Sequence, residues 1–80
     1  MMPPLSDPLT LDEHRELARE LEATCARLRA LSSVVTDVYG PESRAAFSAR
    51  RSVEWIEHLR REMQVQAERD HPGIVAGLYS

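Results

Sequence analysis

The chain has 80 residues, a single cysteine and a formal net charge of −3. Chains this short rarely bury enough apolar surface to fold without a disulfide, a metal or a partner chain. The lone Cys25 excludes a disulfide within the chain, and three histidines far apart in sequence argue against a zinc cluster. Regular helix packing or association with another chain must therefore stabilise the fold.

Hydrophobic residues make up 42% of the chain and charged residues 29%, which is typical of soluble globular proteins. No apolar run approaches the roughly 20 residues that a bilayer span needs, and residues 1–8 do not have the pattern of a secretory signal. We therefore expect a cytoplasmic protein with no membrane segment. All ten basic residues are arginine, but the acidic net charge makes nucleic acid an unlikely general partner.

Proline and glycine divide the chain into segments. They are absent from two runs, 9–39 and 42–71, which are rich in the strong helix formers Ala, Leu, Arg and Glu. This pattern predicts an all-α fold, an antiparallel helical hairpin over 9–71 with helices at 10–39 and 41–70. Gly40 and Pro41 form the predicted turn, residues 1–8 an N-terminal tail, and residues 72–80 an apolar C-terminal tail.

The first predicted helix has a start signal and a sustained apolar stripe. Thr10 and Glu13 have the spacing of a capping box, in which each side chain bonds the backbone amide of the other. Read as heptads, the a and d positions predict a seam along the whole helix, as in a coiled coil. The predicted seam residues are Leu17, Leu21, Leu28, Leu31, Val35 and Val38.

Gly40 and Pro41 predict an abrupt change from one helix to the next. Glycine suits the position after a helix and proline suits the first turn of a new one. A connection this short makes the two helices antiparallel neighbours. The second helix has small side chains near the turn, including Ala45 and Ala49, and larger ones farther along.

A hairpin of two helices has one seam and little interior. We therefore expect two copies to stack face to face as a four-helix bundle, a homodimer, with an unidentified protein as a possible further partner. Aromatic and arginine side chains, which are enriched at binding hot spots, form a mixed stripe beside the seam of the second helix. The interface candidates are Arg44, Phe47, Arg51, Trp55, His58, Ile56, Leu59 and Met63.

Other interpretations of these residues stay open at this stage. The stripe could close the dimer core or bind another protein, and Arg44, Arg50 and Arg51 could bind a phosphate or nucleic acid. Glu54 and His58 are four residues apart, but bundle metal centres need further inward carboxylates, so no metal is expected. We expect Cys25 to be a buried structural thiol.

No catalytic motif is present, and the sequence predicts no cofactor. The favoured function is a non-enzymatic adaptor, scaffold or regulatory subunit. One alternative is a helical-bundle enzyme or ligand-binding protein with a pocket between subunits, and another is a nucleic-acid-associated regulator. The apolar C-terminal tail either folds back over the bundle or docks into another protein.

Overall fold

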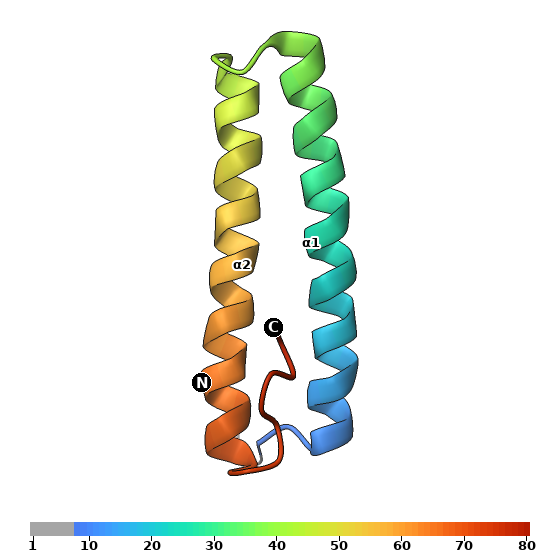
Figure 1. Ribbon diagram of the computed structural model, residues 1–80, viewed down its shortest axis with the longest axis vertical. Helices are drawn as coiled ribbons and strands as arrows, with labels where there is room; N and C mark the ends of the chain where they lie inside the picture. Colours follow the sequence, from blue (N-terminus) through green and yellow to red (C-terminus); the bar gives the residue numbers. More distant parts are fainter. Residues whose placement is uncertain (1–7) are drawn as a thin grey trace, which may run out of the picture.

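The computed structural model describes residues 8–80 and contains two helices, α1 (Leu11–Tyr39) and α2 (Arg44–Asp70), with no strand in that range. The helices run side by side in opposite directions, joined by a short turn at one end of the molecule (Figure 1). The predicted all-α hairpin is therefore confirmed. We call the turn end the tip and the other end the open end. The predicted N-terminal tail lies almost entirely outside the described residues.

The first helix begins and ends as predicted, to within one residue. Thr10 is its N-cap: the Glu13 amide donates to the Thr10 hydroxyl over 3.1 Å, and the Thr10 amide donates to the Glu13 carboxylate over 2.8 Å. The capping box is thus confirmed. At the other end, Gly40 has a φ of +93°, which favours glycine, and its amide donates to the Thr36 carbonyl.

The second helix begins at Arg44, three residues later than predicted. Pro41 and Glu42 lie in the turn, and Ser43 is the N-cap. The Ser43 hydroxyl accepts from the Ala46 amide over 3.1 Å and donates to the Gly40 carbonyl over 2.9 Å. Serine is a preferred N-cap, and its two hydrogen bonds outweighed the preference of proline for the first helical position.

The helices pack along a line that is rotated from the predicted seam. On α1 the covered residues follow the a and e positions of the heptads, including Leu21, Cys25 and Leu28, while the predicted d positions Leu31 and Val38 are exposed. Small side chains face this line, such as the fully buried Ala46 and Ala67 of α2. Small residues let the two helices approach closely, which leaves the larger d side chains outside.

Residues 71–80, which we call the tail, fold back onto the hairpin at its open end. In Figure 1 this segment returns along the two helices. Val75 and Tyr79 are buried against Leu21 and Ala67 and form the hydrophobic core with them. Of the two predicted placements of the tail, the structure has the one that folds back.

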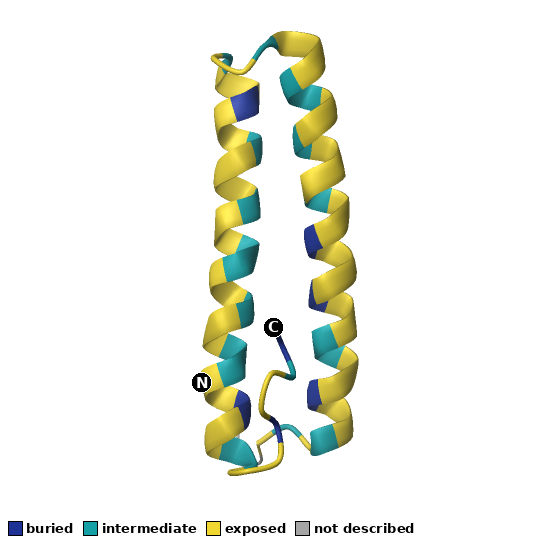
Figure 2. Cartoon of the chain, in the orientation of Figure 1, coloured by how far each residue is buried: buried dark blue, intermediate teal, exposed yellow. Residues whose placement is uncertain are grey.

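The hairpin is one layer thick, with a shortest dimension of 16 Å. Each helix therefore has one helical neighbour, and the tail covers the pair only near the open end. Figure 2 shows the result: buried residues gather in the open half, and the tip half is mostly exposed. Neither α1 nor α2 is apolar enough over a sufficient length to cross a membrane.

Candidate functional site

The ion pair between Arg29 and Glu57 marks one of the two broad faces of the hairpin. Helical residues turn by about 100° each, so a residue two positions away lies roughly on the opposite side of its helix. Leu31 lies two positions after Arg29, and Leu59 and Trp55 lie two positions on either side of Glu57. These three residues are therefore on the face opposite to the ion pair.

This opposite face carries large apolar side chains that no other segment of residues 8–80 covers, with the exposed Arg27 beside them, four residues before Leu31. Val34 and Val38 lie three and seven residues after Leu31, so they share its side of α1. We call the set of five the apolar face. Its members are large side chains with exposed fractions between 42% and 66%: Leu31, Val34, Val38, Trp55 and Leu59.

The predicted seam residues divide between the interior and this face. Those at a positions are covered: Leu21 is buried, and Leu28 and Val35 are half-buried. Of those at d positions, only Leu17 is half-buried, because it packs against the hydrophobic core cluster. The other two, Leu31 and Val38, belong to the apolar face.

Three residues of the predicted aromatic–arginine stripe, Arg51, Trp55 and His58, lie together on the exposed surface of α2. Trp55 lies on the apolar face, with its ring edge against His58 at a centroid distance of 5.7 Å. Phe47 is 57% exposed, but it follows the buried Ala46 and points roughly away from α1. Ile56 and Met63, which were also interface candidates, are half-buried against the core cluster.

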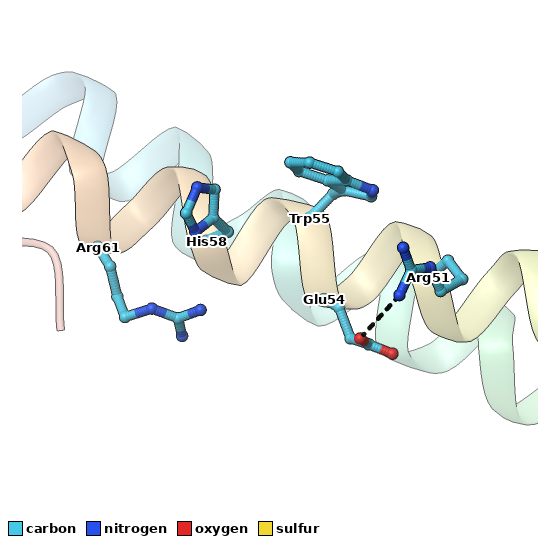
Figure 3. A pocket seen from close by; sticks show the side chains of 5 residues that line it. All are labelled: Arg51, Glu54, Trp55, His58 and Arg61. Carbon is cyan, nitrogen blue, oxygen red and sulfur yellow. Dashed lines mark ion pairs between the residues drawn. The ribbon is translucent and has the colours of Figure 1, made fainter.

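A shallow hollow lies on the outer side of α2. Figure 3 shows its lining residues: Arg51, Glu54, Trp55, His58 and Arg61. All of them come from successive turns of one helix, so the described residues give the hollow no second wall. Arg51 and Glu54 pair across it at 3.7 Å. A molecule seated here would need a partner surface to enclose it.

Part of the arginine patch near the tip is engaged within the chain. Arg50 donates to the Pro41 carbonyl over 3.0 Å, and Arg51 pairs with Glu54, while Arg44 is exposed. His58, which was weighed with Glu54 as a possible metal ligand, lies 3.6 Å from Glu62. Among the described residues no group of three or more His, Cys, Asp or Glu could hold a metal ion.

The open end contains a buried polar cluster that sequence reasoning did not identify. His14 is fully buried, with Nε2 2.8 Å from the Asp70 carboxylate and Nδ1 2.8 Å from the Tyr79 hydroxyl. A carboxylate only accepts hydrogen bonds, so in the neutral ring Nε2 carries the proton and Nδ1 accepts from Tyr79. His71 packs edge-on against His14, and its Nε2 donates to the Leu9 carbonyl over 2.8 Å.

These contacts change the titration of two groups. The hydrogen bond from His14 holds the pKa of Asp70 below its ordinary value of 3.8, and a second bond from Gln66 lowers this pKa further, although partial burial opposes both. Burial raises the pKa of Tyr79 above 10.0, and the nearby Asp70 carboxylate adds to that increase. The lowered pKa of Asp70 and the raised pKa of Tyr79 both stabilise the folded chain near neutral pH, where Asp70 is ionised and Tyr79 is neutral.

Side chains of α2 also hold the backbone of the tail. The Gln64 amide donates to the Val75 carbonyl over 2.7 Å and accepts from the Tyr79 amide over 2.9 Å. Arg60 donates to the Tyr79 carbonyl over 3.0 Å. Gln64 lies seven residues after Glu57 and so on the same side of α2. The tail therefore covers the ion-pair face and leaves the apolar face open.

Cys25 is a free, buried thiol, as expected from its place beside the seam. It lies mid-helix, among small and apolar residues of the seam. Comparisons of the chain with protein-family models, with curated proteins and with solved structures find no match. The functional interpretation therefore rests on the two faces of the hairpin and on the cluster at its open end.

Proposed function

We propose that the protein is a non-enzymatic interaction protein whose hairpins pair through their apolar faces into a four-helix bundle. The observation that carries this proposal is the row of large apolar side chains on one face, from Val38 near the tip to Leu59, which are exposed among the described residues. Scattered exposed apolar residues need no explanation, but a contiguous patch of this kind marks an interaction site. A cytoplasmic location agrees with the free thiol of Cys25.

The size of the apolar face suits a second copy of the chain. Its five side chains expose on the order of 500 Å² in all, close to the largest patches found on monomers. A stable dimer buries about 800 Å² on each partner. The half-buried Leu17 and Met63 extend the face toward the open end, and Ala45 and Ser52 extend it toward the tip. The whole face therefore approaches the area that a dimer needs.

Pairing through this face is compatible with the folded tail. The tail is held by Arg60 and Gln64 on the ion-pair face, and nothing in its contacts obstructs the other side of the hairpin. A bundle can form without displacing it. Pairing covers Trp55 but leaves the rest of the outer side of α2 accessible, with Phe47 and Arg51 exposed. This second surface supports an adaptor or scaffold role, in which the dimer presents two equivalent sites to a further protein.

The oligomeric state tests the proposal directly. We expect light scattering to give a dimer mass, and the melting temperature to rise over a roughly hundredfold range of concentration. Leu31→Asp places a charge in the interface and should give a folded monomer. Val65→Asp is the matched control, because Val65 is similarly exposed but lies on another side of α2. It follows Phe47 by about five whole turns and so shares the outer side with Phe47. Loss of dimer in both variants, or a monomeric wild-type chain, contradicts the proposal.

Two aromatic variants separate the apolar face from the predicted stripe. Trp55→Ala removes the largest side chain of the face and should raise the dimer Kd by at least about tenfold. Phe47→Ala changes an equally exposed aromatic residue outside the face and should leave the Kd unchanged. Equal weakening by both variants would instead identify the stripe as the interface.

A further inference from the structure

The contacts between the helices fix which residues lie at the same height along the hairpin. His14 pairs with Asp70, and Arg29 pairs with Glu57, so residue numbers at one height add up to about 85. Val38 of α1 is therefore level with Phe47 and Ser48 of α2. Likewise, Leu59 is about level with Ala26 of α1.

In the tip half of the apolar face, Val34 and Val38 of α1 lie level with the small Ser52 and Ser48 of α2. In the tip half, α1 carries a ridge of Leu31, Val34 and Val38. Beside it α2 carries a shelf of small residues, which share the side of Trp55 and Leu59 because they precede them by three, seven or fourteen residues. The shelf consists of Ala45, Ser48 and Ser52.

Two of the largest side chains of the apolar face lie level in the middle of the hairpin. Leu31 of α1 and Trp55 of α2 are at one height, and Leu59 is level with Ala26, next to Arg27. Each hairpin thus has a raised α1 near the tip and large side chains on both helices farther down. A flat partner would leave a gap over the small residues of α2, and unfilled gaps forfeit packing energy.

We propose that the apolar face binds a second copy related by a two-fold axis along the length of the hairpin. This inference rests on the proposed function, because it assigns the geometry of that same dimer. A 180° rotation about this axis keeps every residue at its height along the hairpin. It places α1 of one copy over α2 of the other. Val34 and Val38 of each copy then pack on the α2 shelf of the other, while Leu31 meets Trp55 of the other copy. Both tips lie at the same end of the bundle.

The alternative two-fold axis, across the hairpin, gives a poorer match. With the two hairpins fully overlapped, it packs α1 on the α1 of the second copy in the opposite direction, with the tip half of one over the open half of the other. Leu31 would then meet the region of Glu16 and Glu20, and Glu20 lies three turns before Leu31 on the same side of α1. Covering these carboxylates with an apolar ridge is costly because it removes their water.

A distance between the two tips distinguishes the arrangements. A spin label attached to Glu42→Cys lies in the exposed turn. The wild-type Cys25 is buried and should stay unlabelled, and labelling of the wild-type chain serves as the control for this. In the proposed dimer the labels should lie about 20 Å apart, the separation of two packed helices plus the label arms. A separation of about 45 Å, the length of one helix, overturns the proposal. Leu31→Asp should abolish the signal.

A matched pair of size variants provides a second test. Ser48→Leu raises the shelf against the ridge of the second copy and should increase the dimer Kd by at least about tenfold. Val38→Ala lowers the ridge at the same height. Mixing the two variant chains should restore affinity to within about threefold of wild type, because each contact then joins one large and one small residue. Failure of mixing to restore affinity overturns the proposed axis, whereas a chain that never dimerises overturns the proposed function as well.

Discussion

The two halves of the hairpin use the same two helices and reach opposite outcomes. At the open end His14 is fully buried, and Val75 and Tyr79 are 3% and 2% exposed. In the tip half Val38 is 66% exposed and Trp55 is 61% exposed. Sequence composition does not explain this difference, because both halves contain large apolar side chains at helical spacing.

The difference comes from a third packing element. Two helices side by side bury only the line between them, and covering their faces takes another segment. The chain supplies that segment at the open end with its own tail, which brings in Val75 and Tyr79 and is fastened by Gln64. The tip half has no such segment among the described residues. A partner chain would do there what the tail does at the open end.

If this comparison is correct, the largest loss of stability should come from the centre of the open-end cluster. His14→Ala leaves a cavity and removes the partners of Asp70 and Tyr79, so we expect the free energy of unfolding to fall by about 3 kcal/mol. His58→Ala is the control, because His58 is exposed on the outer side of α2 and its loss should cost less than about 0.5 kcal/mol.

Urea unfolding followed by circular dichroism measures both changes, at one protein concentration so that dimerisation contributes equally. Equal losses for the two histidine variants would mean that the open end is no more tightly built than the helix surface, and the contrast between the halves would not hold.

Local patterns in the sequence predicted the helices well. Thr10 and Glu13 lie three residues apart, so their capping box is readable from spacing alone, and α1 ends at Tyr39 as Gly40 indicates. The start of α2 was placed too early because two local signals competed. Proline favours the first helical position, and Ser43 favours the N-cap two residues later.

Long-range features could not be predicted in the same way. The a and d heptad pattern fits α1, but the packing line was decided by small partners on α2 such as Ala46 and Ala67. His14 contacts Asp70 and Tyr79, which lie 56 and 65 positions farther along the sequence, and no local spacing connects these residues. The signal that the sequence offered for this region was the apolar character of the tail, because exposure of an apolar segment to solvent is unfavourable.

A smaller loss is expected from the hydroxyl of Tyr79. Tyr79→Phe keeps the ring and removes the hydrogen bond to His14, so it should lower the free energy of unfolding by about 1 kcal/mol at neutral pH. The pKa of Tyr79 is raised in the fold. The folded chain therefore holds this proton more tightly than the unfolded chain. The contribution of this proton to stability is fully present below pH 10.0. It is lost as the pH rises through the pKa that Tyr79 has in the folded chain.

The phenylalanine variant should lack this alkaline loss, which urea midpoints measured on both sides of pH 10.0 would reveal. Tyr39→Phe is the control at the tip, where the ring is 69% exposed, and it should retain the wild-type alkaline behaviour. An unchanged alkaline slope in the Tyr79 variant would show that the hydroxyl of Tyr79 does not couple titration to folding.

The smallest expected effect is on the acid side and concerns Asp70. Its pKa is lowered in the fold by the His14 hydrogen bond, so its contribution to stability is present above its unfolded value of 3.8 and is lost as the pH falls below that value. Asp70→Asn should flatten this part of the pH dependence, because the neutral amide has no carboxylate proton to gain. Asp37→Asn, an exposed position near the tip, should leave the wild-type curve unchanged. If Asp37→Asn flattens the acid limb as much as Asp70→Asn, the carboxylate at the open end has no special coupling to folding.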